Sequence, residues 1–469
     1  MTDSGEGRFT PGARVAGLCA KLENRTALVG VIGLGYVGLP LALLCTRAGF
    51  HATGFDIDPG KTEKLHRGES YIHHIPSASI AEALETGLFE ATNDFSLLEQ
   101  MNAIIICVPT PLDKHREPDM SFVRNTAEMV SSHLQAGQLV VLESTTYPGT
   151  TDEEMIAILE KPDLKCPVSP YTTDGSSVTG SEGVEPDFFL AFSPEREDPG
   201  NKNFQTQQVP KIVGGVNAAS ALAAQALYQS IFEHTHLVSS SRAAEMTKLL
   251  ENIYRCVNIA LVNELKLLCL KMDIDIWEVI AAAKTKPFGF NAFYPGPGLG
   301  GHCIPVDPFY LTWKAREYEF PTRFIELAGE INTAMPHHVV NHLAVALGNQ
   351  GKTLNGARVL VLGAAYKKDI DDVRESPALK IIELLGVQGA VVAYHDPFVP
   401  RLVKMRKYDF GLESIPLSAE TLRAHDCTLI VTDHSAVDYD MVVTESPLVV
   451  DTRNATSRVA LHREKIVQC

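Results

Sequence analysis

The stretch Leu28-Val-Gly-Val-Ile-Gly-Leu-Gly-Tyr-Val-Gly38 decides the fold of the first half of this chain. An apolar run of strand length leads into a glycine-rich turn, an apolar helical segment follows at 39–48, and a second apolar run ends at Asp56. In a βαβ unit of this kind, the glycines permit a tight turn that places a pyrophosphate at the helix N-terminus. The pattern therefore predicts a dinucleotide-binding unit. The alternative is a glycine-rich turn in an α/β domain without a ligand.

Asp56 stands where such units hold the ribose of the dinucleotide. Its carboxylate can accept hydrogen bonds from ribose hydroxyls and would repel a 2′-phosphate. We therefore expect NAD rather than NADP.

Further apolar runs recur along the chain with helical stretches between several of them, which predicts mostly parallel sheets. The overall prediction is an α/β protein with two Rossmann-like, doubly wound domains joined by a long central helix. That helix is expected from 243 to about 283, with a break near 272–275. The additional strands are expected at 103–108, 139–142, 188–192, 358–362, 390–394, 427–431 and 448–450.

Four regions are expected. Residues 1–26 form a flexible extension, and 27–225 form the dinucleotide-binding domain, with an exposed Pro-, Ser-, Thr- and Gly-rich insertion at about 161–187. Residues 226–348 form a central helical domain that mediates dimerisation, because long apolar helices between domains commonly build interfaces. Residues 349–469 form a second α/β domain.

Bulk composition limits the class of protein. A formal net charge of -16 argues against nucleic acid and an anionic membrane surface as partners. No apolar run approaches the roughly 20 residues that span a bilayer, and the first residues lack the apolar segment of a signal peptide, so we expect a cytoplasmic protein. The nine cysteines show no C-x-x-C spacing, which implies neither a disulfide framework nor a metal site.

The loop Pro295-Gly-Pro-Gly-Leu-Gly-Gly-His-Cys-Ile-Pro-Val-Asp-Pro308 supplies a candidate nucleophile, Cys303, beside His302 and four residues before Asp307. A redox cofactor combined with a nucleophilic thiol indicates oxidation of an alcohol past the aldehyde to the acid. The alternative is a buried structural cysteine in a Gly/Pro turn.

Other polar residues stand out in apolar surroundings. Lys248 and Asn252 are four residues apart on one helical face, where they can hold a hydroxyl and stabilise negative charge, or form an ordinary solvated stripe. Glu195, Arg196 and the hydroxyls that follow Glu143 come directly after predicted strands, where α/β ligand sites gather, although turn chemistry also explains them. Basic groups in the C-terminal domain can bind phosphates or form a surface charge run: Lys367, Lys368, Arg374 and Arg453.

Taken together, several motifs of this chain closely resemble those of the nucleotide-sugar 6-dehydrogenases. These motifs are Gly33-Leu-Gly-Tyr-Val-Gly-Leu-Pro-Leu-Ala42, Ser193-Pro-Glu195, Lys248 with Asn252, Gly300-Gly-His-Cys303 with Asp307, and the segment 367–377. Within this family the chain looks most like the branch acting on UDP-N-acetylhexosamines, and especially UDP-N-acetylglucosamine 6-dehydrogenases. The resemblance implies a four-electron oxidation of the sugar C6 alcohol to a carboxylate with two NAD molecules, through a thiohemiacetal and a thioester on Cys303. It also implies a UDP-sugar site in the C-terminal domain, a homodimer or higher homo-oligomer, and a role in polysaccharide biosynthesis.

The resemblance implies roles for individual residues. The implied catalytic residues are Cys303, Lys248, Asn252, Asp307, Glu195 and Thr145. The implied NAD-binding residues are Gly33, Gly35, Tyr36, Val37, Gly38, Asp56, Lys61, Thr110, Thr145 and Arg374. The implied substrate-binding residues are Glu195, Arg196, Lys248, Asn252, Tyr294, Gly296, Gly298, Gly300, Lys367 and Arg453.

Three alternatives stay open at this point. UDP-N-acetylmannosamine, UDP-N-acetylgalactosamine or UDP-glucose can be the substrate in place of UDP-N-acetylglucosamine. A two-electron hydroxy acid dehydrogenase would need no cysteine. A non-catalytic protein would bind NADH without turning anything over.

Overall fold

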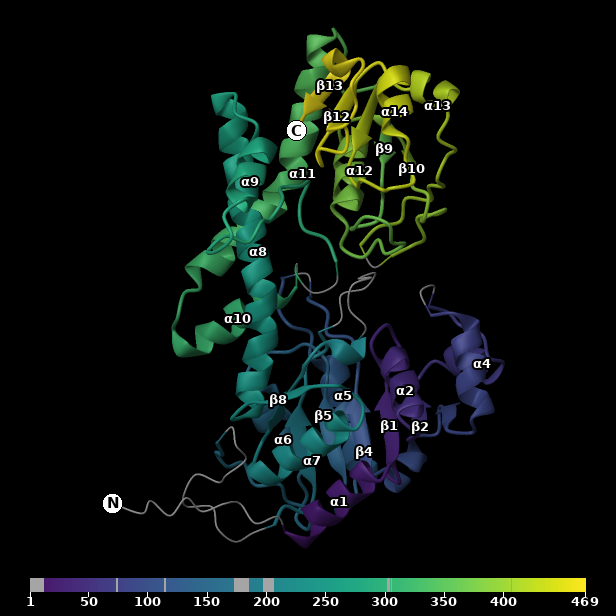
Figure 1. Cartoon of the computed structure of the whole chain (residues 1–469), viewed down its shortest axis with the longest axis vertical. Coiled ribbons are helices and arrows are strands. Elements are labelled where there is room, and N and C mark those ends of the chain that lie inside the picture. The colour runs from purple at the N-terminus through teal and green to yellow at the C-terminus, as the bar shows by residue number, and fades with distance from the viewer. Residues whose placement is uncertain are drawn as a thin grey trace. The chain divides into compact units, whose positions relative to one another are not determined.

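The structure is a computed structural model that describes residues 12–72, 75–113, 115–172, 185–196, 206–301, 304, 306–405 and 407–469. It divides into two compact units, Met1–Glu251 and Asn252–Cys469 (Figure 1). Among the described residues, no helix combines the length and apolar character needed to cross a bilayer.

The first unit is built on an eight-stranded sheet of order β3-β2-β1-β4-β5-β6-β7-β8. All neighbouring strands are parallel except β6 and β7. Its central strands are buried along their whole length because helices cover both faces. The strands are β1 (Leu28–Ile32), β2 (His51–Phe55), β3 (Phe89–Thr92), β4 (Ala103–Ile106), β5 (Leu139–Leu142), β6 (Phe189–Phe192), β7 (Lys211–Gly215) and β8 (Thr235–Leu237).

The helices of this unit follow the strands in the alternating order expected of a doubly wound fold. They are α1 (Ala13–Glu23), α2 (Gly38–Arg47), α3 (Pro59–His66), α4 (Ser77–Glu85), α5 (Ser121–His133), α6 (Ile156–Leu159) and α7 (Ala218–Gln229). A π-helical segment, Thr150–Met155, leads into α6.

The prediction of a flexible extension at 1–26 is wrong for its described part. Helix α1 packs on α7 through an apolar stripe, in which Val15, Leu18 and Leu22 are buried (Figure 1). These residues recur at helical spacing, so their burial offsets the entropy lost in ordering the segment. The first eleven residues lie outside the described part of the chain.

The expected insertion at 161–187 is exposed at most positions of its first described part, 161–172, but hydrogen bonds anchor both of its described ends to the domain. Tyr171 is buried, and its hydroxyl donates to the carbonyl of Val238 and accepts from the N–H of Gly215. At the other end, Glu185 accepts the N–H groups of Arg14 and Val15 and so caps helix α1. Residues 173–184 lie outside the described residues.

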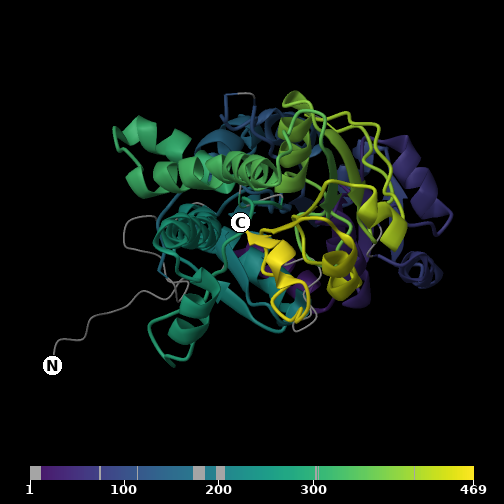
Figure 2. The same cartoon turned by 90° about the horizontal axis from the view of Figure 1, so that it is seen from above.

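The second unit contains a five-stranded parallel sheet of order β10-β9-β11-β12-β13. Helices α11 and α12 pack against each other and cover this sheet, and α10 packs on α11 (Figure 2). The strands are β9 (Arg358–Leu362), β10 (Val391–His395), β11 (Cys427–Ile430), β12 (Val449–Asp451) and β13 (Ile466–Gln468). The helices are α9 (Ile276–Lys284), α10 (Asp307–Ala315), α11 (Arg323–Asn349), α12 (Pro377–Val387), α13 (Ala419–Arg423) and α14 (Tyr439–Glu445).

The long central helix is α8, which runs over the 32 residues Ser241–Met272 and contains the boundary between the two units. It ends where the sequence predicted a break, and α9 restarts at Ile276 with Asp275 as its N-cap, whose side chain accepts the N–H of Trp277. The predicted fold class, two doubly wound α/β sheets in one chain, is confirmed.

Candidate active site

The glycine-rich turn after β1 forms a cradle that only glycine permits. Gly33 has a positive φ of 92°, and a Cβ there would lie 2.5 Å from the carbonyl oxygen of Cys107. A Cβ at Gly38, where α2 begins, would collide with the carbonyl oxygen of Gly33. The helix N-terminus therefore stays open for an anion, as a dinucleotide pyrophosphate requires. Gly35 has open space at its Cβ position, and Tyr36 is exposed beside it.

Asp56 follows β2 and links the turn to the next helix. Its Oδ2 accepts the N–H of Leu34 at 2.9 Å and the ammonium of Lys61 at 2.8 Å, and its Oδ1 accepts the N–H of Asp58. The buried carboxylate thus holds the glycine-rich turn in place and brings Lys61 to it. This geometry fits a dinucleotide whose ribose lies at the end of β2.

Three predicted residues follow the adjacent strands β4, β5 and β6 at one edge of the sheet. Thr110 is buried in the segment after β4, Thr145 is half-buried after β5, and Glu195 comes three residues after β6. The carboxyl ends of parallel strands meet at one edge, so the fold brings these residues to the side that carries the glycine-rich turn.

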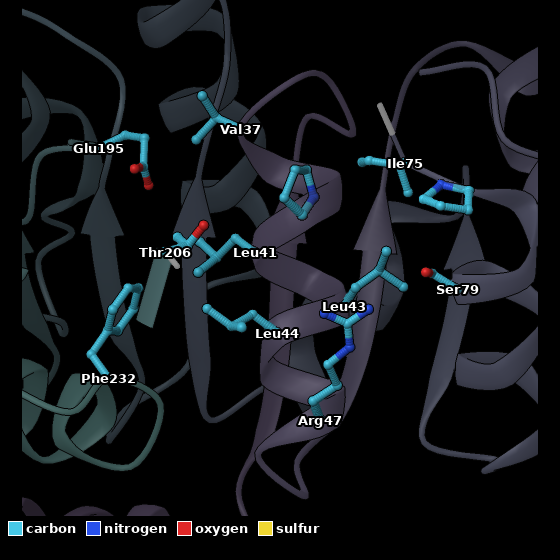
Figure 3. A pocket seen from close by; sticks show the side chains of 12 residues that line it. Val37, Leu41, Leu43, Leu44, Arg47, Ile75, Ser79, Glu195, Thr206 and Phe232 are labelled. Carbon is cyan, nitrogen blue, oxygen red and sulfur yellow. The ribbon is translucent and has the colours of Figure 1, made fainter. Parts of the chain in front are cut away.

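A hollow of about 270 Å³ connects the glycine-rich turn with Glu195. Val37 and Glu195 lie at one end of the hollow and Arg47 lies at the other, with Leu41 and Leu44 of α2 between them (Figure 3). Pro76 and Ser79 of the α4 region and Thr206 and Phe232 complete much of its wall. The hollow therefore combines apolar walls with one carboxylate near the predicted cofactor turn, as ligand sites commonly do.

Lys248 and Arg196 both form hydrogen bonds with Glu195. The Lys248 ammonium donates to the backbone carbonyl of Glu195 at 2.6 Å, and Lys248 is buried. Arg196 donates its N–H to Glu195 Oε1, and its guanidinium pairs with Glu251 at 2.6 Å. The structure thus brings together three sequence-predicted residues of the first unit.

Sequence reasoning missed a buried ion cluster behind Glu195. Lys211, the first residue of β7, lies 2.9 Å from Oε2 of Glu143 and 3.5 Å from Oε2 of Glu195. The Tyr228 hydroxyl donates to the other oxygen of Glu143. A lysine inside the apolar run Val209-Pro-Lys-Ile-Val213 was the available signal, because a buried charge of this kind needs a partner.

In the second unit, Asn252 and Asp307, two residues to which the resemblance assigns catalytic roles, contact each other. Both are buried, and the Asn252 amide donates to Oδ2 of Asp307, at the start of α10. The side-chain oxygen of Asn252, Oδ1, in turn accepts a hydrogen bond from the guanidinium of Arg255. The amide is therefore fixed in orientation, with its donor group directed to the carboxylate.

The loop before Cys303 approaches the C-terminal domain closely. Gly296 donates its N–H to Asn263, and a Cβ there would collide with the guanidinium of Arg453. A Cβ at Gly300 would lie 2.5 Å from Cβ of Tyr366, next to Lys367.

The other predicted residues of this loop occupy distinct positions. Gly298 has a positive φ of 141°, and the exposed Tyr294 stacks on Trp277. His302, Cys303 and residue 305 lie outside the described residues, so the structure does not place the candidate nucleophile.

Two basic residues of the second unit have acidic neighbours. Arg453 donates to Asp433 at 3.4 Å, and Arg374 pairs with Asp372 at 2.7 Å. The carbonyl of Arg374 also accepts the N–H of Gly301. Arg374 thus belongs to the second unit, whereas the other residues assigned to NAD belong to the first.

Comparison with known protein families matches three consecutive parts of the chain to one family. Residues 27–232 match the NAD binding domain of the UDP-glucose/GDP-mannose dehydrogenase family, residues 242–334 match its central domain, and residues 360–458 match its UDP binding domain. The expected NAD cofactor and nucleotide-sugar dehydrogenase class are confirmed by these matches.

Individual relatives agree with the family match. A UDP-N-acetyl-D-glucosamine 6-dehydrogenase of Pseudomonas aeruginosa is 34% identical over 408 residues, which cover 87% of this chain and 90% of that protein. A UDP-N-acetyl-D-mannosamine dehydrogenase of Escherichia coli K12 is 33% identical, with 87% and 94% covered. A solved UDP-D-ManNAc dehydrogenase from Pyrococcus horikoshii superposes with a TM-score of 0.79 at 32% identity, covering 91% of this chain and 96% of that one. The chain therefore belongs to the UDP-glucose/GDP-mannose dehydrogenase family.

Proposed function

We propose that this protein oxidises the C6 hydroxyl of a UDP-N-acetylhexosamine to the carboxylate, and that UDP-N-acetylglucosamine is the substrate. The observation that carries the proposal is the hollow of the first unit, where the carboxylate of Glu195 and Val37 of the cofactor turn lie at the same end (Figure 3). The acetylated relatives named above support this substrate class. The C-terminal α/β domain would hold the UDP part, with Lys367 and Arg453 as its basic groups.

The cofactor would be held by the turn Gly33–Gly38, by Asp56 with Lys61, by Thr110 and Thr145, and by Arg374 of the second unit. NAD, when bound, accepts one hydride in each of two successive oxidations. The protein must therefore remove the proton from the C6 hydroxyl and retain the aldehyde between the two oxidations.

Cys303 is the proposed nucleophile that retains the aldehyde. Among the described cysteines all except Cys269 are buried, and burial raises the pKa of the Cys45 and Cys166 thiols to about 12, which makes them poor nucleophiles at neutral pH. Addition of the Cys303 thiol to the aldehyde carbon gives a thiohemiacetal. Loss of a hydride and a proton from the thiohemiacetal gives a thioester.

Release of the product consumes one water. The Glu195 carboxylate takes a proton from this water, with Thr145 helping to position it, and the resulting hydroxide attacks the thioester carbonyl. The C–S bond then breaks, and Cys303 leaves as a thiolate. Lys248, and Asn252 with Asp307, are the proposed groups that stabilise the oxyanions and accept or return protons.

The decisive test is the number of NADH molecules formed per sugar when the sugar is limiting. Two NADH per UDP-N-acetylglucosamine is the expected result, with UDP-N-acetylmannosamine, UDP-N-acetylgalactosamine and UDP-glucose run in parallel. One NADH per sugar would overturn the four-electron reaction, and turnover confined to another sugar would overturn the substrate. Replacing Cys303 by Ser should slow or stop acid release, whereas the matched change Cys269→Ser should leave it intact.

We also propose a homodimer formed through α8. Leu261, Leu265, Leu268 and Met272 recur at helical spacing on this helix and are 39% to 57% exposed. Contact with a second copy would bury this stripe. The double change Leu261→Lys with Leu268→Lys should halve the mass in light scattering, whereas Leu461→Lys, at an exposed leucine elsewhere, should not. An unchanged mass in the double variant would contradict the proposal.

A further inference from the structure

The ion cluster behind Glu195 is held by three elements of the first unit. Glu143 directly follows β5, Glu195 follows β6, and Lys211 begins β7, which runs antiparallel to β6. The side chains of Lys211 and Glu143 are 3% and 0% exposed, whereas that of Glu195 is 19% exposed and lines the hollow. The cluster therefore has a closed inner end and one carboxylate at the open end.

One ammonium faces two carboxylates in this cluster. Lys211 Nζ is nearer to Glu143 Oε2, at 2.9 Å, than to Glu195 Oε2, at 3.5 Å. Both carboxylate oxygens of Glu143 have a partner, because the second one accepts a hydrogen bond from the Tyr228 hydroxyl. The rings of Tyr228 and Phe232 lie 5.2 and 5.4 Å from the ammonium and add cation–π attraction. Glu143 thus anchors Lys211 and competes with Glu195 for its charge.

The protonation states follow from burial and pairing. Burial would lower the pKa of Lys211, but attraction to Glu143 and Glu195 outweighs it and raises the pKa, so Lys211 stays an ammonium. Burial also raises the pKa of Glu143, and the charge of Glu195 adds to this effect while Lys211 opposes it. The two carboxylates therefore disfavour each other's ionisation, and Lys211 relieves that repulsion.

Other charged and titratable groups surround Glu195 without replacing Lys211. Lys248 of α8 donates to the backbone carbonyl of Glu195, not to its carboxylate, and the Arg196 guanidinium is engaged by Glu251. Cys107, after β4, is a buried thiol whose pKa burial raises well above its ordinary value, so it carries no charge at neutral pH. Lys211 thus reaches the Glu195 carboxylate from inside the protein, at 3.5 Å, whereas the described cations Lys248 and Arg196 are held by other groups.

We propose that Lys211 is a positioning residue that keeps the Glu195 carboxylate ionised and directed into the hollow, and that Glu143 limits this effect by competing for the same ammonium. The inference rests on the proposed function, in which Glu195 takes the proton from the attacking water. It predicts that changes at Lys211 and Glu143 shift the pH dependence of acid release in opposite directions, which loss of packing alone would not do.

The test compares the pH dependence of acid release in Lys211→Met and Glu143→Gln with that of the native protein. Loss of the ammonium raises the pH at which Glu195 ionises, so the acidic limb should move up by about one pH unit or more in Lys211→Met. Loss of the competing carboxylate should move the limb to lower pH in Glu143→Gln. Tyr228→Phe, which keeps all three charges, should leave the limb in place.

A second variant and a second readout keep the inference testable. If Lys211→Met does not fold, because it leaves the buried Glu143 carboxylate facing that of Glu195 without a cation, the double variant Lys211→Met with Glu143→Gln removes both buried charges and should still show a raised limb. The ionisation of Glu195 can also be followed without turnover, by ¹³C NMR of carboxyl-labelled glutamate with the signal assigned by its loss in Glu195→Gln.

The two readouts separate the two proposals. An NMR titration of Glu195 that is the same in native protein, Lys211→Met and the double variant would overturn the inference, whatever the enzyme oxidises. Opposite shifts in the NMR titration of a protein that makes no acid would support the role of Lys211 and overturn the proposed function alone.

Discussion

Replacing Lys266 by Met should make the second unit more stable at neutral pH. Lys266 lies on α8 at the wall of a hollow of about 240 Å³ shared with Met335, Val339 and His342, and it is 2% exposed. Its ammonium donates a long hydrogen bond of 3.4 Å to the carbonyl of Thr452. Burial, together with repulsion from Arg453, lowers the pKa of Lys266 to about 8.

The size of the effect follows from the proton affinity. An unfolded lysine has a pKa of about 10.4, and each unit of difference corresponds to about 1.4 kcal/mol, so holding the buried ammonium at pH 7 costs about 3 kcal/mol. Because the unfolded chain binds more protons than the folded one between pH 8 and about 10.4, the unfolding free energy of the native protein should rise with pH in this window. Lys266→Met should be about 2–3 kcal/mol more stable at pH 7, and its advantage should vanish near pH 10.

Tryptophan fluorescence is the suitable assay for urea unfolding. Both tryptophans of the chain, Trp277 and Trp313, lie in the unit that contains Lys266. Lys271→Met, at an exposed lysine of the same helix, is the control and should leave the stability nearly unchanged. The reasoning is refuted if Lys266→Met is no more stable than this control at pH 7, or if its advantage persists unchanged to pH 10.

Three further predictions concern the first unit. Gly38→Ala should weaken NADH binding at least about tenfold in a fluorescence titration, because the added Cβ collides with the carbonyl of Gly33 and displaces the helix start that receives the pyrophosphate. In helix α1, Leu18→Ala should lower the unfolding free energy by about 2–4 kcal/mol, and Gly17→Ala, on the exposed face, should raise it by about 0.5–1 kcal/mol, both measured by circular dichroism in urea. Burial raises the pKa of Glu245 to about 8, so Glu245→Gln should cost about 1–3 kcal/mol in the same assay above that pH, where the ionised carboxylate accepts two backbone N–H groups and an amide can accept at only one of its two ends.

The sequence predicted those parts of the fold that are specified by residues close together in the chain. The strand before Gly33, the glycine-rich turn and the helix after it lie within one short stretch, and the break between α8 and α9 is marked by Asp275 as an N-cap. The apolar spacing of helix α1 is also visible in the sequence, although this segment lies outside the family resemblance on which the prediction of an extension rests. A segment outside the family resemblance can therefore still carry a local pattern that specifies a helix.

The parts that sequence did not predict depend on partners far apart in the chain. Lys211 contacts Glu143, which lies 68 residues away in the sequence, and Tyr171 donates to Val238, which lies 67 residues away. A short stretch of sequence therefore contains neither pair. Asn252 and Asp307 are 55 residues apart, and the resemblance gives each a catalytic role without indicating that they contact each other. A lysine inside an apolar strand indicates that a partner must exist, but only the sheet order identifies which carboxylate it is.

The contacts of Glu195 change how loss of activity at Lys248 should be interpreted. Lys248 holds the backbone carbonyl of Glu195 while Lys211 faces its carboxylate, so two lysines constrain the two ends of one residue. Removing Lys248 would therefore remove a proposed oxyanion group and also release the backbone that aims the proposed water base. A fall in the rate of such a variant would combine both losses, and effects of this kind do not add when residues share a partner. The separate contribution of Lys248 can be obtained in a Glu195→Gln background, because the contribution of a correctly held Glu195 carboxylate is already absent there.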